Sequence, residues 1–263
     1  MKVVRGERAA RALRGVRLAC GTALLALSAC AGTETGNPSF KGSLGYDAYS
    51  SAPRSVALTQ SSSEKEDAAL RVDNAWLVLG DVELLRGEDC AAVAGSGMHV
   101  QGLGAGDHAA GQAPVTPFDL AAGQYCGARL PFVLAGEKLP AQAPDSLRDE
   151  SIVLRGSLAD GRSFELRSAS QAQVLLRARE ASFLLDDDHS GVLIGFDVAK
   201  WLGALDWSEA SPDADGSLRV SEAQNEALLR EFERALPDGV GLFRDADRDG
   251  LLDRDSTPIA SGE

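Results

Sequence analysis

The middle of the chain consists of short apolar runs separated by Gly and Asp, and this spacing constrains the fold more than any other feature. The predicted strands cover residues 75–85, 124–133, 152–154, 174–178, 182–185 and 192–196. Residues 152–154 lead into the turn Ala159-Asp160-Gly161, after which Phe164 and Leu166 alternate with charged residues, a pattern typical of a β-hairpin. No helical period separates these strands. The sequence therefore predicts a mainly β fold, an antiparallel β-sandwich over residues 67–200. The Gly/Ala-rich segment 94–113 is predicted to be a long loop.

The pattern changes to a helical period after residue 198. Residues 198–205 predict a short helical turn that carries Trp201. Residues 221–236 predict an amphipathic helix, with Ser221 as its N-cap and with Pro237 and Gly239 at its end. One face of this helix carries Ala223, Ala227, Leu228, Phe232 and Leu236. We therefore expect residues 201–263 to form a small α-helical appendage to the sandwich.

The N-terminus has the composition of an export signal. Basic residues precede a short apolar run over residues 18–27, which ends at Leu27-Ser28-Ala29-Cys30. The run is shorter than the ~20 residues that a membrane-spanning helix needs. The pattern resembles a bacterial lipobox, which implies a signal peptide over residues 1–29 and a lipid on Cys30. The implied location is the cell envelope, with the outer membrane as the expected site. An ordinary cleaved signal with a chance cysteine is the alternative.

Residues 30–66 are rich in Gly, Ser and Thr, and this composition predicts a flexible tether between the anchor and the folded part. The run Thr33-Glu34-Thr35-Gly36-Asn37-Pro38 resembles a motif of lipoproteins from gliding soil bacteria. No physical role follows from that run.

Two further runs carry a resemblance to a transthyretin-like domain of bacterial lipoproteins. They are Leu120-Ala121-Ala122-Gly123-Gln124-Tyr125 and Ile194-Gly195-Phe196-Asp197-Val198. The resemblance covers residues 68–200 and implies a β-sandwich without catalytic residues. Cys90 and Cys126 are not part of that family's pattern.

Composition argues against several classes of function. The formal net charge is −13, and no basic stripe remains outside the signal, which disfavours nucleic-acid binding. The three histidines, His99, His108 and His189, lie in no HExxH motif and beside no nucleophile motif. We therefore expect a protein that is not an enzyme and that contacts the membrane through lipid alone, with a hydrolase as a distant alternative.

The cysteines allow one disulfide in the mature chain. Cys20 leaves with the signal and Cys30 is expected to carry lipid, which leaves Cys90 and Cys126 in an exported, oxidising setting. A disulfide between them is the prediction. A metal site that includes His99 and His108, or two free thiols, are the alternatives.

The strongest chemical signal is the run from Asp245 to Asp253, which resembles an EF-hand-type calcium loop. Carboxylates stand at every second position, and Gly250 at the sixth position permits a sharp turn. The predicted ligand residues are Asp245, Asp247, Asp249, Leu251 and Asp253. Ser256 replaces the bidentate Glu at the twelfth position, where Asp255 or Glu263 would have to substitute. The predicted cofactor is a structural calcium ion, and the alternative is a solvated acidic tail.

Two earlier segments have similar spacing. The second candidate loop has the predicted ligands Ser211, Asp213, Asp215, Ser217 and Glu222, and its alternative is an Asp-Gly turn before a capped helix. The third, over residues 186–197, is interpreted as a β-turn between two strands, because its flanks are strand-like.

The sequence favours a lipid-anchored envelope protein without enzymatic activity and with a calcium-stabilised C-terminal segment. The alternative is a surface module that binds a carbohydrate or a protein partner through loops near Trp201 and Trp207. An exposed aromatic platform would favour the alternative, whereas buried tryptophans, including Trp76, would favour a structural role.

Overall fold

A computed structural model describes residues 39–52, 56–58, 70–87, 89–95, 99–103, 116–253 and 255–262. The chain divides into two compact units, Met1–Gly36 and Asn37–Glu263, and all the described residues belong to the second unit. The predicted signal peptide, Cys30, residues 33–38 and His108 lie outside the described residues.

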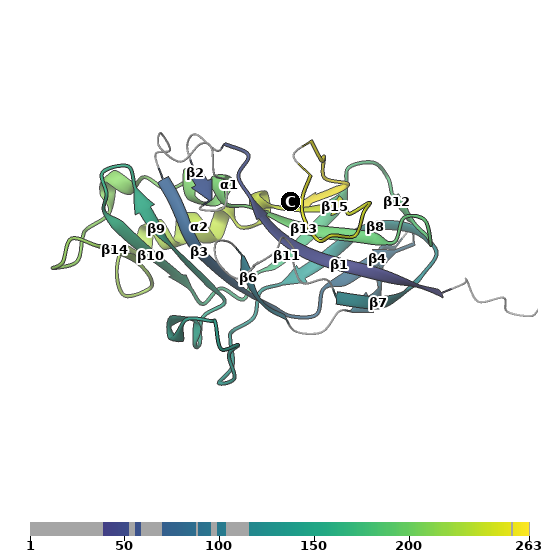
Figure 1. Cartoon of the computed structure of the whole chain (residues 1–263), viewed down its shortest axis with the longest axis horizontal. Helices are drawn as coiled ribbons and strands as arrows, with labels where there is room; N and C mark the ends of the chain where they lie inside the picture. The colour runs from purple at the N-terminus through teal and green to yellow at the C-terminus, as the bar shows by residue number, and fades with distance from the viewer. Residues whose placement is uncertain are drawn as a thin grey trace, which may run out of the picture. The chain divides into compact units, whose positions relative to one another are not determined.

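The second unit is built from two β-sheets (Figure 1). The larger sheet contains β1 (Ser39–Tyr49), β4 (Glu83–Arg86), β5 (Ala91–Gly95), β7 (Thr116–Ala121), β8 (Gly123–Pro131), β11 (Gln173–Ala178), β12 (Phe183–Leu185), β13 (Gly191–Asp197), β15 (Val240–Arg244) and β16 (Ala260–Gly262). Its strand order is β5-β4-β8-β11-β16-β15-β13-β1-β7, and β12 pairs with β8. The smaller sheet contains β2 (Val56–Leu58), β3 (Leu70–Leu79), β6 (His99–Leu103), β9 (Ile152–Leu158), β10 (Ser163–Ser168) and β14 (Leu218–Val220). The predicted mainly β, sandwich-like fold class is confirmed.

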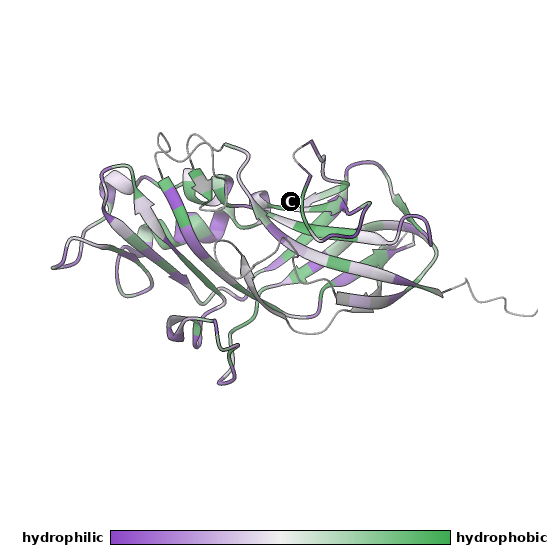
Figure 2. Cartoon of the chain, viewed as in Figure 1, coloured by the Kyte–Doolittle hydropathy of each residue, from purple (hydrophilic) through white to green (hydrophobic). Residues whose placement is uncertain are grey.

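Apolar side chains from both sheets form one continuous core. Figure 2 shows the hydrophobic residues as green stretches along the strands of both sheets. Strand β3 is buried on both faces: Val72, Leu77 and Leu79 join this core. Trp76 and Val78, on the opposite face, belong to a second apolar cluster. The near-continuous apolar sequence of β3 follows from this two-sided burial.

The predicted tether over residues 30–66 is wrong where the structure describes it, because Ser39–Tyr49 forms β1, an inner strand of the larger sheet. Phe40, Leu44 and Tyr46 are buried at alternate positions, and β1 pairs with β13 and β7. Within β1, Gly42 and Gly45 are packing residues. A Cβ on Gly42 would lie 2.6 Å from Leu120 Cδ1, so a larger residue would require the Leu120 side chain to move.

The expected division between a sandwich over residues 67–200 and an appendage over residues 201–263 is also wrong. Strands β15 and β16 lie in the middle of the larger sheet, and the C-terminal apolar residues belong to the main core. The indole of Trp201 is fully buried between the rings of Phe196 and Phe232, at centroid distances of 5.7 and 5.9 Å. One core therefore includes both parts.

Both predicted helical segments exist, with one shifted boundary. Helix α1 (Val198–Gly203) begins after Asp197, whose Oδ1 accepts a hydrogen bond from the Ala199 amide at 3.1 Å. Helix α2 spans Glu226–Ala235 and so begins later than predicted. Ser221 is not its N-cap, because β14 holds the preceding chain extended and Ser221 forms a bridge with Gln224. Within the described residues, no helix is long and apolar enough to cross a membrane.

Strand pairing is mixed rather than purely antiparallel. The hairpin of β9 and β10 is antiparallel as predicted, but β1 pairs with β13, β2 with β3 and β10 with β14 in parallel. Within the segment predicted to be a long loop, His99–Leu103 forms β6 and pairs with β3.

Candidate metal centre

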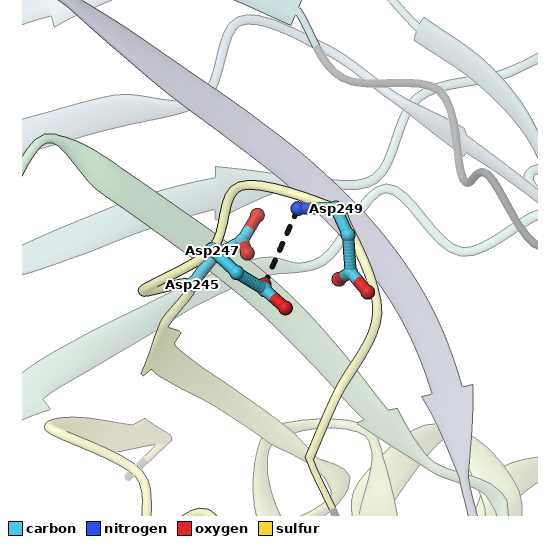
Figure 3. Close-up of side chains that lie close together, drawn as sticks. All are labelled: Asp245, Asp247 and Asp249. Carbon is cyan, nitrogen blue, oxygen red and sulfur yellow. Dashed lines mark hydrogen bonds between the residues drawn. The ribbon is translucent and has the colours of Figure 1, made fainter.

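The group formed by Asp245, Asp247 and Asp249 lies at the end of β15 (Figure 3). One ligand atom from each carboxylate lies within 4.8 Å of the others. No other group of three or more His, Cys, Asp or Glu side chains comes this close together in the part of the chain that the structure describes. These three residues are members of the ligand set that the sequence predicts.

Backbone hydrogen bonds curl the loop around the carboxylates. Asp245 Oδ2 accepts a bond from the Gly250 amide at 3.1 Å, and Asp249 Oδ1 accepts one from the Leu251 amide at 2.8 Å. Gly250 has a φ of 75°, in the left-handed region that favours glycine. The glycine at the sixth position thus makes the sharp turn that the sequence pattern predicts.

Asp245 has a carboxyl group that is buried and only partly hydrogen-bonded. Its relative exposure is 3%, and its Oδ1 atom is buried without a hydrogen-bond partner. Burial raises the pKa of Asp245, and the charges of Asp249 and Asp247 raise it further, while the Gly250 amide lowers it. A buried carboxylate oxygen without a partner is costly, and a bound cation would satisfy it.

Among the residues that the structure describes, no basic side chain neutralises the group. Arg248 lies between the carboxylates in sequence, but its guanidinium donates to the main-chain oxygen of Asp187 at 3.0 Å. Among the described residues, no ion pair joins any of the three aspartates to a Lys, Arg or His. The charges of this group therefore remain available for a metal ion.

The loop is attached to distant parts of the chain. The Asp245 amide donates to Gly191 O at 3.2 Å, and the Leu252 amide donates to Asp47 Oδ2 on β1 at 3.0 Å. A Cβ on Gly45 of β1 would lie 3.1 Å from Gly250 Cα. Sequence reasoning missed Asp47 and Gly45, because they lie in the segment assigned to the tether.

The remaining predicted ligands of this loop are not part of the carboxylate group. Asp253 is exposed and lies outside the group, and Leu251 is half-buried with its amide bonded to Asp249. The structure thus assembles three of the five predicted ligand residues by their side chains.

The second candidate loop is not assembled as a metal site. Asp213 forms an ion pair with Arg219 at 3.3 Å, and Asp215 Oδ1 accepts bonds from the amide and the hydroxyl of Ser217. The Ser211 amide donates to Asn225 Oδ1 instead, and Glu222 is exposed and takes no part in a ligand group. Because Arg219 already neutralises Asp213, this segment is an Asp-Gly turn, which was the alternative interpretation.

The third segment is a turn between β12 and β13, as interpreted from the sequence. Asp186 Oδ1 accepts bonds from the His189 amide at 2.9 Å and from its Nδ1 at 2.8 Å. The His189 side chain lowers the pKa of Asp186 through the hydrogen bond. This turn contacts the metal-centre loop through Arg248.

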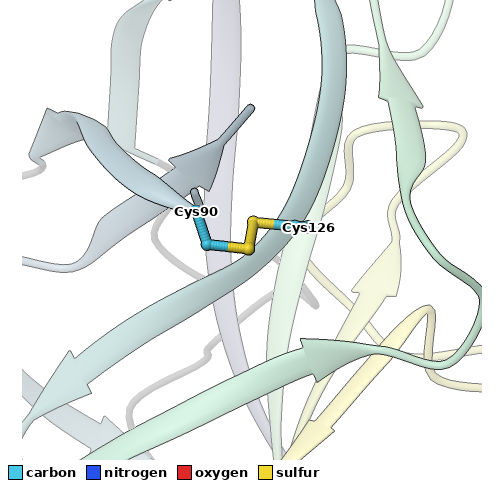
Figure 4. The surroundings of a disulfide bond; sticks show 2 residues. All are labelled: Cys90 and Cys126. Atoms are coloured by element: carbon cyan, nitrogen blue, oxygen red, sulfur yellow. A yellow bond between two sulfur atoms is a disulfide. The ribbon is translucent and has the colours of Figure 1, made fainter. Parts of the chain in front are cut away.

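Cys90 and Cys126 form a disulfide, with a Cα–Cα distance of 5.9 Å (Figure 4). Cys126 is the extra residue of a β-bulge, because Leu85 pairs with Gly127 and Arg86 pairs with Tyr125. The bond joins β8 to the turn after β4, and the prediction of a disulfide is confirmed.

The tryptophans do not form an exposed aromatic platform. Trp201 is fully buried and its Nε1 donates to Leu236 O at 3.1 Å, while Trp76 lies in the second apolar cluster. Trp207 is partly buried against the ring of Phe164, at a centroid distance of 5.0 Å. All three side chains therefore have packing roles.

Comparisons with known proteins give no relative from which a function could be transferred. The chain matches no protein-family model, no curated protein and no solved structure.

We expect Asp245→Asn to stabilise the protein in the presence of a metal chelator. The substitution removes a buried charge, keeps an oxygen for the Gly250 amide, and supplies an NH₂ group that can donate to a neighbouring carboxylate. Urea unfolding in EDTA should show a gain of about 1 kcal/mol. Asp247→Asn, at an exposed position, is the matched control and should change stability by less than ~0.5 kcal/mol. A loss of stability in Asp245→Asn would contradict the charge argument.

Removing the disulfide should destabilise the fold by about 4 kcal/mol in the chain-entropy model, given the sequence separation of 36 residues. Cys90→Ala, Cys126→Ala and the double variant should lose the same amount in denaturant unfolding, because each removes the same bond. An unreduced digest should contain one linked peptide pair. Alkylation of both thiols without reductant would show that the bond is absent.

Proposed function

We propose that this chain is a lipid-anchored protein of the bacterial cell envelope, that it has no catalytic role, and that a calcium ion at the Asp245, Asp247 and Asp249 group stabilises its C-terminal part. The observation that carries the metal part of the proposal is the buried, unpartnered Oδ1 of Asp245 within that group.

The donor set favours calcium among the common metal ions. The group offers carboxylate oxygens and contains neither a thiolate nor an imidazole, a set that suits a hard cation. Calcium tolerates the irregular geometry of a loop better than magnesium, which needs a near-ideal octahedral shell. Leu251 and Asp253, which the EF-hand-like spacing also selects, are the proposed additional ligands.

The ion would act on the fold rather than as a signal. Loop 245–253 lies between β15 and β16 and is bonded to β1 through Asp47. Neutralising the three carboxylates would remove their mutual repulsion in a loop that three separate segments hold in place. The expected consequence is a more stable connection between the C-terminal strands and β1.

The lipid anchor is supported by the sequence of residues 1–30. The basic residues, the short apolar run and Leu27-Ser28-Ala29-Cys30 agree with one another as parts of a lipoprotein signal. The even pair of cysteines, joined as a disulfide, suits an exported protein. The alternative of carbohydrate binding through the tryptophans loses its support, because these side chains are packed in the fold.

Calcium should raise the melting temperature of the full chain in detergent. A dissociation constant of about 10⁻³ M, as in extracellular modules, gives about 1.4 kcal/mol of stabilisation at about 10 mM calcium. Asp247→Ala should abolish most of this gain, because it removes one of three carboxylates. Differential scanning calorimetry with calcium, magnesium and EDTA measures the effect.

Asp238→Ala is the control for a lost surface carboxylate, because Asp238 is exposed and lies outside the group. It should keep the full response to calcium, and magnesium should stabilise the wild-type protein less than calcium does. Calcium without effect on the wild-type protein, or an equal loss in both variants, would refute the metal site.

Cys30→Ala should abolish lipid attachment, because this cysteine is the expected acceptor. Metabolic labelling with a radioactive fatty acid and membrane fractionation should both lose the signal. Cys20→Ala is the matched control, since Cys20 lies within the proposed signal peptide and should not affect labelling. Labelling that persists in Cys30→Ala would exclude this residue as the anchor.

A further inference from the structure

The larger sheet has a gap between β12 and the end of β15, where no strand of the described chain pairs with either of them. Strand β16 pairs with β15 at Gly241 and Leu242 and with β11 as far as Ala178. Ile259, the residue before β16, makes the last main-chain bonds on this side of the strand. Its amide donates to Leu242 O at 2.7 Å, and its carbonyl oxygen accepts from the Arg179 amide at 3.0 Å. Pro258 has no amide N–H to continue the pairing, so the chain leaves the sheet there.

Two strand edges face this gap, and in the described chain neither edge is paired with a strand there. Asp245 donates its amide to β13, so the alternating main-chain groups of Arg244 point the other way, toward the gap. Leu184 O accepts a bond from the Arg244 guanidinium at 2.5 Å, which shows that the main-chain groups of Leu184 point away from β8. In the described chain, β12 pairs with β8 alone, and the pairing of β15 with β16 stops at Leu242. The Arg244 side chain, and not a strand, therefore spans the distance between these edges.

The gap is an open groove with a volume of about 650 Å³. Its walls are the turn over residues 179–182, strand β12, Arg244 and residues 257–259. Leu184, at 40% exposure one of two exposed large apolar side chains among the described residues, lines the groove together with Phe183. The groove thus combines an apolar wall with the main-chain edges of two strands.

The charge of the groove is opposite to that of the whole chain. Arg179 and Arg244 line it, against a single acid, Glu180, whereas the chain has a net charge of −13. Arg179 is exposed and forms no ion pair with any residue that the structure describes. A free guanidinium beside an open strand edge favours an extended ligand that carries a carboxylate.

We propose that the groove binds an extended acidic peptide segment of a partner protein, which enters as a short strand between β12 and β15, in line with β16. The Arg244 guanidinium would leave Leu184 O as the peptide enters, and main-chain bonds to Leu184 and Arg244 would then provide affinity, as in other cases of strand addition. Alternating side chains of the peptide place apolar groups on Leu184 and a carboxylate near Arg179. This inference is independent of the lipid anchor and of the calcium site.

The test uses the full chain in detergent and a labelled probe peptide, acetyl-Val-Glu-Val-Glu-Val-amide. We expect binding in fluorescence polarisation with a dissociation constant at or below about 1 mM, as for a weak strand-addition contact. Hydrogen–deuterium exchange with mass spectrometry should show slower exchange in fragments that contain Leu184 and Arg244. Absence of binding at that concentration, or no protection in these fragments, would overturn the proposal.

Arg179→Glu should weaken binding about tenfold, whereas Arg234→Glu, at an exposed position on α2 outside the groove, should leave it within about twofold. Leu184→Pro should abolish binding, because it removes the amide that points into the groove and spares the pairing of Phe183 and Leu185 with β8.

A probe with N-methyl groups on alternate amides tests whether main-chain hydrogen bonds hold the peptide, without altering the protein. It should not bind the wild-type chain. The same measurement is made with a lysine-containing analogue and with free glutarate. If any of the three bound as tightly as the original peptide, the groove would take a small anion or a nonspecific ligand. That result would refute strand addition.

Discussion

The pairing of β13 with β1 on one side and β15 on the other holds this structure together. All seven residues of β13 are buried, so the strand is enclosed on both faces and on both edges. At its Gly191 end it accepts the amide of Asp245, and at its Asp197 end it caps α1 and accepts the amide of Ser51. The metal-centre loop and the first helix are therefore positioned by the two ends of one strand, and neither would keep its place if β13 moved.

Local patterns in the sequence predicted what local contacts determine. The hairpin of β9 and β10 and the turn of helix after Asp197 were recognisable, because alternation and helical period are properties of adjacent residues. Strand β1 was not recognisable, because Gly42 interrupts its apolar alternation at the point where Leu120 packs against it, and Gly45 adds a second glycine where Gly250 lies close. Its parallel pairing with β13 leaves no local signal either, since the two strands are far apart in the chain.

The two aspartate-rich loops show why spacing alone does not define a metal site. Asp245 follows a buried strand and keeps an unpartnered oxygen, whereas Asp213 lies beside Arg219 and is neutralised by it. The first arrangement concentrates negative charge in a place with little water, where a cation gains most from binding. In the second arrangement, Arg219 neutralises the carboxylate of Asp213 in an ordinary ion pair near the surface. Burial and the direction of one arginine separate the two cases, and neither can be read from the spacing of carboxylates.

The parallel contact between β1 and β13 also joins two segments that are made at very different times during synthesis. Ser43 pairs with Gly191, so β1 leaves the ribosome long before its partner exists. Contacts between such distant residues form slowly, because a long loop must close first. Until β13 is in place, β1 can pair with β7 alone among its two partners, so one edge of β1 stays open. Lys41, Gly42 and Ser43 lower the apolar content of this segment, which disfavours aggregation through the open edge, so glycine has a second use before the fold is complete.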